Sequence, residues 1–277
     1  MDSQIVHRAI LPENYRFLQQ HVYFQVGIVL EEDKHYLFES RLAPIVKELG
    51  LKSTNDLCDL LHAKRSNELG HQVAEAMTTN ETYFFREPNH YEAIRNVLLP
   101  KLKEDRRDNR ILRFWSAAAS TGQEAYSLAM MLHEEHLASW NIQILGTDFS
   151  SKVVERARAG LFQQIEVNRG LPTALLVKHF RPSGLDWQLG DTIRRMVRFE
   201  TIDLRKKMAG LGPFDLVFCR NVMIYFDNET KRNIMKEIHG TLFRGGWLLL
   251  GGSESIFGLD EWFERRAVGN QTVYVAR

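Results

Sequence analysis

The stretch Phe114-Trp115-Ser116-Ala117-Ala118-Ala119-Ser120-Thr121-Gly122-Gln123-Glu124 decides how the chain folds. It joins an apolar, strand-like run that begins at Ile111 to a helical pattern that begins near Glu124. The residues between them are small, which lets a ligand approach the backbone N–H groups at the start of the helix. A strand, a small-residue loop and a helix are typical of an α/β domain, in which ligands bind beyond the carboxyl ends of the strands.

Strand-like runs and amphipathic helices alternate from residue 111 onward, which predicts an α/β domain with a mostly parallel sheet. We expect strands at residues 111–115, 142–147, 197–202, 214–219, 247–250 and 272–275. We expect helices at residues 124–135, 151–159, 172–180 and 229–242. The last two strands have no helix between them, which predicts an antiparallel edge or a hairpin. Two short extended pieces around Gly190-Asp191 predict a small β insertion at approximately 183–198.

Residues 1–76 show helical periodicity without strand-like alternation, and they predict a small all-α domain of four helices. Gly27 and Gly50 are placed to end the first two helices. Pro44 is expected to kink or restart the second helix. The sequence therefore predicts a helical domain at 1–76 and an α/β domain at 77–277.

The composition is that of an ordinary globular protein, with 277 residues, 44% hydrophobic residues and a net charge of +1. Proteins that wrap duplex nucleic acid normally carry a clear basic surplus, so we expect no nucleic-acid partner. The apolar runs are far shorter than the roughly 20 residues that cross a bilayer. No secretory signal opens the chain and only two cysteines occur, so we expect a cytoplasmic protein. His133-Glu134-Glu135-His136 lacks the spacing of a zinc motif, so we expect no metal.

Two carboxylates that follow strands each have two interpretations. Glu124 has capping-box spacing from Thr121 and could satisfy a backbone donor, but it could equally hold a ligand ammonium, and the spacing does not decide. Asp148 could accept hydrogen bonds from both hydroxyls of a ribose or could cap the next helix. We favour the ribose because Ser150 is available as the cap. The loop at 116–122 is not G-x-G-x-x-G, which favours a nucleoside cofactor smaller than a dinucleotide.

Polar Asn221 and Tyr225 lie among apolar residues where the run at 214–219 ends. Side chains in such a place can line a site, and they can equally be a turn asparagine and a core tyrosine. Cys219 has neither a partner nor the spacing for catalysis, and we interpret it as a small core residue.

Three long motifs occur in one order along the chain: MTTNETYFFRE at 77–87, FWSAAASTGQEAYS at 114–127 and FCRNVMIYF at 218–226. Together with GGSES at 251–255 and QTVY at 271–274, they resemble the chemotaxis receptor glutamate O-methyltransferases, the CheR family. The resemblance covers essentially the whole chain. It implies a Rossmann-like SAM-dependent methyltransferase domain with a small β-subdomain insertion, preceded by a small all-α N-terminal domain; SAM is S-adenosyl-L-methionine, and the product is S-adenosyl-L-homocysteine.

The resemblance also implies roles for individual residues. Glu124 would take the ammonium of SAM and Asp148 the ribose, while Asp203 and Leu204 would bracket the adenine. Asp203 stands where some relatives are expected to have Asn, and a carboxylate can still accept from the adenine amino group. Arg86 and Tyr225 would be the catalytic pair. The implied cofactor-binding residues are Asn80, Thr82, Arg86, Ala118, Glu124, Asp148, Asp203, Leu204, Asn221 and Val222.

The implied activity is methyl transfer to glutamate carboxylates in the cytoplasmic domain of methyl-accepting chemotaxis receptors, performed by a monomer. A substrate glutamate with a pKa of about 4.3 is already ionised at neutral pH, so the reaction needs no general base. One alternative is a nucleic-acid amino methyltransferase, because 221–225 is faintly similar to an Asn-Pro-Pro-Tyr element, although both prolines are missing. Another is a non-catalytic SAM-binding regulatory module or an NAD-binding sensor.

Basic residues gather in two places that could meet a glutamate-rich receptor. Lys34, Arg41, Lys47 and Lys52 surround the second expected helix. Arg194, Arg195 and Arg198 lie on the expected insertion. We expect both clusters to recruit the receptor by charge, most strongly at low salt.

Overall fold

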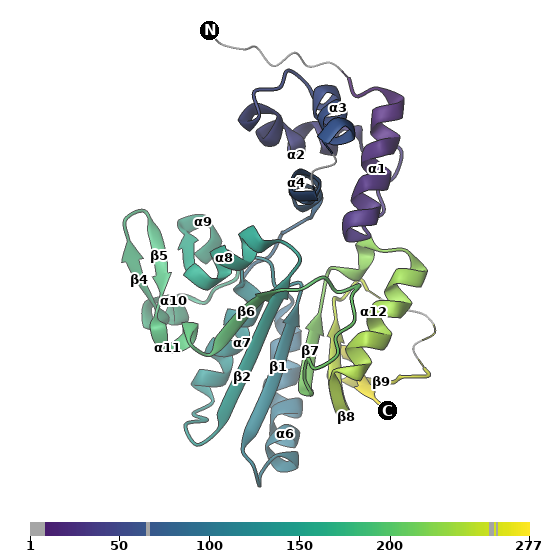
Figure 1. Ribbon diagram of the computed structural model, residues 1–277. Coiled ribbons are helices and arrows are strands. Elements are labelled where there is room, and N and C mark those ends of the chain that lie inside the picture. The colour runs from purple at the N-terminus through teal and green to yellow at the C-terminus, as the bar shows by residue number, and fades with distance from the viewer. Residues whose placement is uncertain (1–8, 65–66, 255–257, 259) are drawn as a thin grey trace. The chain divides into compact units, whose positions relative to one another are not determined.

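The structure, a computed structural model, describes residues 9–64, 67–254, 258 and 260–277, and its chain forms two units (Figure 1). The helical unit contains the residues up to Thr79 together with Tyr225–Thr230, which lie much later in the sequence. The sheet unit contains Asn80–Ile224 and Lys231–Arg277. No helix among the described residues is long and apolar enough to span a bilayer.

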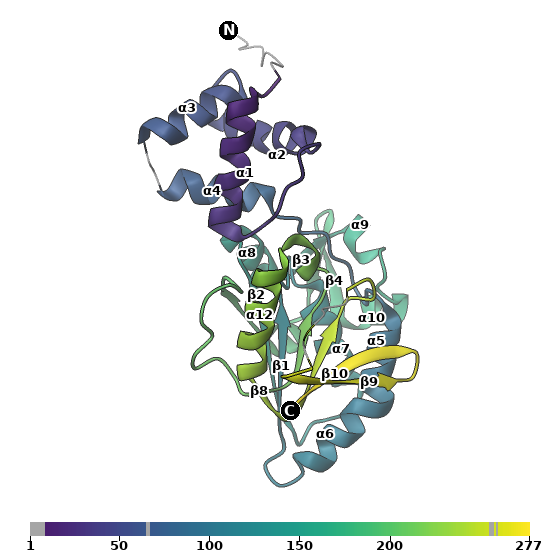
Figure 2. The ribbon, with the colours of Figure 1, turned by 90° about the vertical axis from the view of Figure 1, so that its right-hand side faces the viewer.

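Apolar residues one turn apart build the helical unit, as the sequence predicts. On the first helix, Tyr15, Leu18 and Val22 are buried on one face. That helix ends at Gly27, whose φ of 76° is left-handed and whose N–H donates to the carbonyl of Tyr23, so the expected helix end is confirmed. Figure 2 shows the helices of this unit, which are α1 (Pro12–Val26), α2 (His35–Glu48), α3 (Thr54–Lys64) and α4 (Asn67–Met77).

Helix α2 runs through Pro44 without the expected restart, and its Arg41 ties it to the end of α4. Nη1 of Arg41 donates to the carbonyls of Met77 at 2.6 Å and Thr78 at 3.2 Å, and Nη2 donates to the hydroxyl of Thr79 at 3.0 Å. Carbonyls at a helix end have no helical N–H partner and need one from elsewhere. The guanidinium of Arg41 therefore already makes hydrogen bonds within its own unit, whereas recruitment of a receptor would need hydrogen-bond donors that are available to a partner.

The main sheet of the sheet unit has the strand order β6-β2-β1-β7-β8-β10-β9. Neighbours from β6 to β8 are parallel, and β10 is antiparallel to both β8 and β9, which confirms the expected antiparallel edge. The hairpin at this edge joins β10 to β9 and not to β8. Strand β9 was not expected, because its four central residues are exposed and give no apolar alternation. The strands are β1 (Ile111–Ala117), β2 (Asn141–Asp148), β6 (Val197–Thr201), β7 (Phe214–Cys219), β8 (Leu242–Leu250), β9 (Phe263–Val268) and β10 (Gln271–Ala276).

Helices complete the α/β architecture, and α7 contributes most to the core because nearly all of its residues are buried. Its Leu128 and Leu132 belong to the same buried cluster as Leu112 and Phe114 of β1. The helices of the sheet unit are α5 (Pro88–Ala93), the π-helical η1 (Ile94–Leu98), α6 (Leu99–Asp105), α7 (Gln123–Glu134), α8 (Ser151–Ala159), α9 (Gln164–Val167), α10 (Thr173–His179), α11 (Asp191–Arg194) and α12 (Asn228–Gly240), the last beginning in the helical unit.

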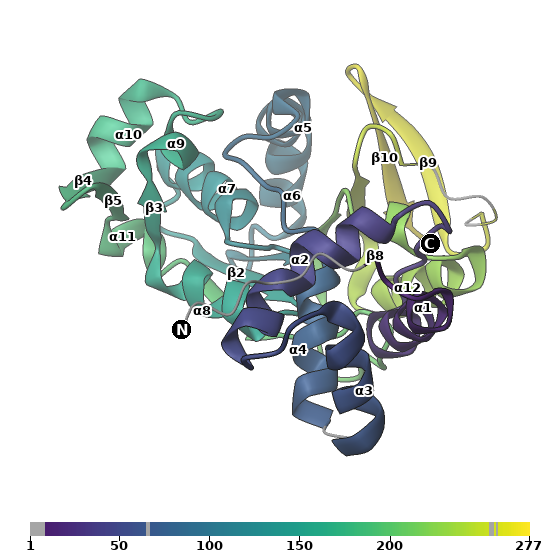
Figure 3. The ribbon, with the colours of Figure 1, turned by 90° about the horizontal axis from the view of Figure 1, so that it is seen from above.

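The small β insertion exists, but it begins earlier than expected. It is a three-stranded antiparallel sheet in the order β3-β5-β4, made by β3 (Leu161–Gln163), β4 (Phe180–Ser183) and β5 (Asp186–Leu189). The extended piece expected before Gly190 is confirmed as β5. The piece expected after it is wrong, because Gly190 is the N-cap of helix α11 and Val197 starts β6 of the main sheet. Figure 3 shows this small sheet and the β9–β10 hairpin on opposite sides of the sheet unit.

We predict that Gly170→Ala destabilises the protein more than Gly184→Ala. Both glycines have left-handed φ values, 80° and 63°, so both variants carry backbone strain of about 1 kcal/mol. A Cβ at Gly170 would also overlap the carbonyl of Phe84, whereas a Cβ at Gly184 meets open space. Urea titration should give a loss of free energy of unfolding of about 2–4 kcal/mol for Gly170→Ala once overpacking is added. Equal losses in the two variants would contradict the close approach of Phe84.

Candidate functional site

Loops from several strands meet at the carboxyl edge of the main sheet. Ala117, the last residue of β1, pairs with Thr147 of β2 and with Cys219 of β7, so these strands end at the same level. A groove of about 490 Å³ lies elsewhere, beside earlier residues of the strands such as Arg113 and Gln143. The candidate site is therefore defined by polar side chains that converge on the carboxyl edge, and not by that groove.

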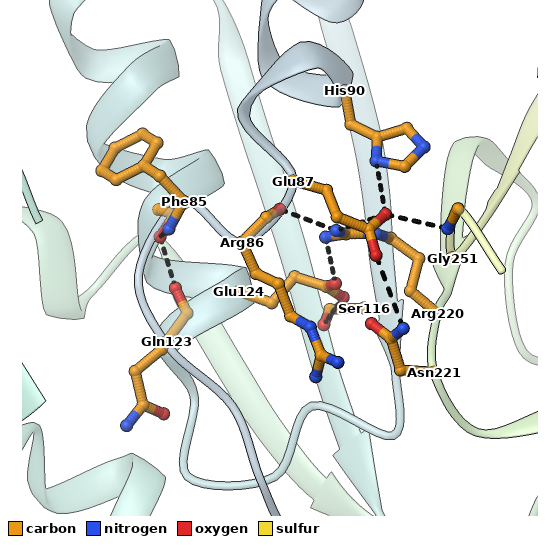
Figure 4. A network of polar contacts seen from close by, with 12 residues as sticks. Phe85, Arg86, Glu87, His90, Ser116, Gln123, Glu124, Arg220, Asn221 and Gly251 are labelled. Atoms are coloured by element: carbon orange, nitrogen blue, oxygen red, sulfur yellow. Dashed lines mark hydrogen bonds and ion pairs between the residues drawn. The ribbon is translucent and has the colours of Figure 1, made fainter. Parts of the chain in front are cut away.

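Arg220, directly after β7, is at the centre of this convergence (Figure 4). Its side chain is 1% exposed, Nη1 donates to Oε2 of Glu124 at 2.8 Å, and Nη2 lies 3.2 Å from Oε2 of Glu87. Nη2 also donates to the carbonyl of Arg86 at 2.6 Å. One buried guanidinium thus joins two carboxylates and the backbone of the segment that precedes α5.

Glu87 links three segments through one carboxylate. Besides Arg220, its Oε2 lies 3.2 Å from Nδ1 of His90 and accepts from the N–H of Gly252 at 3.0 Å, and its Oε1 accepts from Nδ2 of Asn221 at 3.5 Å. Burial alone would raise the pKa of Glu87, but the contact with Nδ1 of His90 and the charge of Arg220 outweigh burial and hold the pKa far below its usual range. Glu87 is therefore an ionised carboxylate at neutral pH.

Arg86 lies between two residues with left-handed backbone, Phe85 at φ 52° and Glu87 at φ 58°. Its Nη1 donates to the carbonyl of Glu81 at 3.1 Å, and its guanidinium lies 5.5 Å from the ring centroid of Tyr83. Among the described residues, no carboxylate forms an ion pair with Arg86. The charge of Arg86 is thus available to an anionic ligand.

Glu124 does not cap the helix on which it lies. Gly122 is the N-cap of α7 and no side-chain cap bond is formed, so the capping-box interpretation is wrong. The Glu124 carboxylate instead accepts from the hydroxyl of Ser116 at 2.7 Å and from Arg220. Its side chain is only 13% exposed. A carboxylate can accept more hydrogen bonds than these two, so Glu124 can still accept from a ligand.

Asp148 lies at the end of β2, and Ser150 is the cap of the following helix, as expected. The carboxylate of Asp148 accepts from the N–H groups of Ser120 at 2.9 Å and Ser150 at 3.0 Å. Ala118 and Ser120 have left-handed φ values of 60° and 51°, and the hydroxyl of Ser120 donates to the carbonyl of Asn80 at 2.8 Å. Asp148 therefore holds the small-residue loop, which contains Ala118, at the end of β2. Through Ser120 of that loop, Asn80 is held beside it.

Asp203 and Leu204 follow β6 and are both largely buried. The Asp203 carboxylate accepts from Nε of Arg205 at 3.0 Å and from Nη2 at 2.7 Å. This bidentate pair was not foreseen, and it engages both oxygens of Asp203 within its own loop. Thr82 is partly buried in the segment that leads to Arg86.

Glu254 organises the loop that contains Asn221 and Val222. Its carboxylate accepts from the N–H groups of Asn221 at 2.6 Å, Val222 at 2.9 Å and Met223 at 2.8 Å, and also from Gly251 at 2.8 Å. Asn221 itself has a φ of 57°. Tyr225 ends the 3₁₀ helix η2 (Met223–Tyr225) and belongs to the helical unit, where its carbonyl accepts from Val29 at 2.9 Å.

The charges of this site suit a cationic ligand. Glu87 and Glu124 carry two negative charges and Arg220 carries one positive charge, so these three side chains leave one negative charge in a mostly buried place. Buried charge is costly unless it is paired, and SAM carries both an ammonium and a sulfonium. Among the described residues, no group of His, Cys, Asp and Glu side chains is arranged to hold a metal ion.

The sheet, the small-residue loop after β1 and the acidic residue after β2 are those of an α/β domain that binds a nucleoside at the carboxyl edge of its sheet. Residues 80–271 match the family described as CheR methyltransferase, SAM binding domain, and residues 13–78 match CheR methyltransferase, all-alpha domain. The chain belongs to the CheR methyltransferase family, and its cofactor is SAM.

Named relatives match over nearly their whole length. Chemotaxis protein methyltransferase Cher2 of Pseudomonas putida is 36% identical over 95% of this chain and 98% of its own. Chemotaxis protein methyltransferase 1 of Pseudomonas aeruginosa is 38% identical over 91% of this chain and 93% of its own. Chemotaxis protein methyltransferase of Borreliella burgdorferi is 37% identical over 86% of each chain.

We predict that Glu87 contributes to stability in a pH-dependent way. Its pKa is lower in the folded protein than in the unfolded chain, where a glutamate has a pKa of about 4.3, so its contribution is present above that value and is lost as the pH falls through the folded pKa. Urea titrations of wild type and Glu87→Gln should show a difference in free energy of unfolding that is constant from about pH 7 to pH 5 and shrinks below about pH 4.

The exposed Glu155 on α8 offers a control, and Glu155→Gln should follow wild type at every pH. A difference between wild type and Glu87→Gln that grows on acidification would contradict an ionised Glu87.

Proposed function

We propose that this protein transfers the methyl group of SAM to glutamate side-chain carboxylates of methyl-accepting chemotaxis receptors, forming glutamate methyl esters. The observation that carries the proposal is Arg86, a cation at the carboxyl edge of the sheet with no carboxylate partner among the described residues. A guanidinium without a carboxylate partner can bind the carboxylate of the methyl-accepting glutamate by two parallel hydrogen bonds. The names of the relatives, which are chemotaxis protein methyltransferases, support the same acceptor.

In this proposal the carboxyl edge binds SAM through residues of the segment before α5 and of the loops at the ends of β1, β2, β6 and β7. Glu124 holds the ammonium, because the negative charge left by Arg220 is beside it, and Asp148 holds the ribose hydroxyls. Leu204 packs on the adenine, whereas Asp203 contributes less directly because Arg205 already engages its carboxylate. The remaining cofactor-binding residues are Asn80, Thr82, Arg86, Ala118, Asn221 and Val222.

The chemistry asks the protein mainly for positioning. The cofactor supplies an electrophilic methyl group on a sulfonium. Arg86 orients one oxygen of the acceptor glutamate so that the other oxygen remains a nucleophile, and Tyr225 is the second catalytic residue of the proposal. Alignment of two reacting groups in this way is worth about 7–11 kcal/mol of the barrier. The acceptor is the cytoplasmic domain of the receptor, and the enzyme acts on it as a cytoplasmic monomer.

Methyl transfer from radiolabelled SAM tests the proposal. Membranes enriched in chemoreceptors should gain label that is released as methanol by mild alkali, because esters hydrolyse in base whereas methylated amines do not. Duplex DNA should gain none. Label that enters DNA, or label on receptors that resists alkali, would contradict a glutamate O-methyltransferase, and SAM binding without any transfer would favour a regulatory module.

We predict that Asp148→Ala weakens the binding of both SAM and its demethylated product. A hydrogen bond to a charged group contributes about 1.5–3 kcal/mol, so calorimetry should show a loss of roughly 10- to 100-fold in affinity. Asp215→Asn, at the start of β7, is the control and should bind SAM normally. Unchanged affinity of Asp148→Ala would remove Asp148 from the ribose site.

A further inference from the structure

We propose that Glu87 and Arg220 are positioning residues for methyl transfer, which fix the backbone at Arg86 and hold the Glu124 carboxylate beside it. The inference rests on the proposed function and adds two residues that touch neither the cofactor nor the acceptor. Figure 4 shows the contacts on which it depends.

The backbone on either side of Arg86 needs an external restraint. Phe85 and Glu87 are non-glycine residues with φ values of 52° and 58°, and such a conformation costs about 1–3 kcal/mol unless the surroundings impose it. On one side the N–H of Phe85 donates to the hydroxyl of Ser127 at 2.9 Å. On the other side Arg220 donates to the carbonyl of Arg86 at 2.6 Å. The direction of the Arg86 side chain is therefore set by the group that holds its carbonyl.

Glu87 holds Arg220 in that position and joins Arg86 to the rest of the edge. Its carboxylate pairs with Nη2 of Arg220 at 3.2 Å, the same nitrogen that reaches the carbonyl of Arg86. It also accepts from the N–H of Gly252, in the loop after β8, at 3.0 Å. Removal of its charge would free Arg220 to move toward Glu124, and the Arg86 segment would lose its connection to two loops.

Arg220 is placed to act through other residues and not on a ligand. Its side chain is 1% exposed, both of its Nη atoms are engaged by protein groups, and its buried Nε has no partner among the described residues. A buried ion pair with an unsatisfied donor is a poor way to gain stability, and an apolar pair of similar volume often serves better. A role in fixing the positions of Arg86 and Glu124 explains why the protein has this ion pair.

A second buried ion pair on the same strand provides a matched control. Asp215 at the start of β7 is 1% exposed and its Oδ1 accepts from Nε of Arg106 at 2.6 Å. It lies at the amino end of β7, whereas Arg220 follows the carboxyl end. Asp215→Asn removes one charge from a buried pair, as Glu87→Gln does, without touching the site.

The test is a double-mutant cycle between Glu87→Gln and Arg86→Ala, read as kcat for receptor methylation and as Kd for SAM. Alone, Glu87→Gln should lower kcat, measured at saturating SAM, about 10- to 100-fold, as expected for a misplaced catalytic group. It should also weaken SAM binding, because it removes the negative charge that Arg220 leaves unpaired beside Glu124. In the Arg86→Ala background it should lower kcat by less than twofold, because a residue that acts through Arg86 has nothing left to position. Asp215→Asn should keep wild-type kcat, and Arg220→Lys should lose both kcat and SAM affinity because it also releases Glu124.

Two results would overturn the proposal: a wild-type kcat in Glu87→Gln, or an equal fold-loss of kcat with and without Arg86. If wild type itself transfers no methyl group to receptors, the proposed function fails, and positioning is then judged by ¹⁵N relaxation of the Arg86 amide. That amide should be rigid, with an order parameter of about 0.85, in wild type and Asp215→Asn, and should fall below about 0.6 in Glu87→Gln. An equally rigid amide in Glu87→Gln would reject the positioning role without reference to activity.

Discussion

Arg220 is shared by Glu87 and Glu124, and this shared ion pair organises the carboxyl edge of the sheet. One guanidinium cannot neutralise two carboxylates, so these three side chains retain one negative charge in a place that is largely removed from water. Buried charge of this kind is tolerated when a partner is near, and a cationic cofactor provides one. Folding and cofactor binding are thereby linked, because a ligand that pairs this charge also stabilises the folded state.

Carboxylates, which only accept hydrogen bonds when ionised, hold the remaining loops by their backbone N–H groups. Glu254 accepts from four N–H groups across the loops after β7 and β8. Asp148 accepts from two N–H groups in the loops after β1 and β2. Left-handed residues occur in these loops, Ala118, Ser120 and Asn221 among them, and the carboxylates supply the restraint that such conformations require.

The parts of the structure that depend on local pattern could be predicted from the sequence. Short apolar runs located the parallel strands and helical spacing located α1 to α4, because both patterns are set within a few residues. The exposed strand β9 has no such pattern, and the small sheet was misplaced because an extended piece was expected after Gly190, where the chain instead begins helix α11. In the site, Ser150 was correctly expected to cap α8, but the capping role of Glu124 was wrong. Its true partner, Arg220, is 96 residues away in sequence, and no local spacing reports such a contact.

A crystal structure with the demethylated cofactor bound would test the central claim most directly. The account predicts that the ammonium of the cofactor lies within about 3.2 Å of the Glu124 carboxylate, the usual limit for such a hydrogen bond, while Arg220 keeps its bonds to Glu124, Glu87 and the carbonyl of Arg86. An ammonium bound elsewhere, or an Arg220 that leaves both carboxylates to contact the cofactor itself, would contradict it.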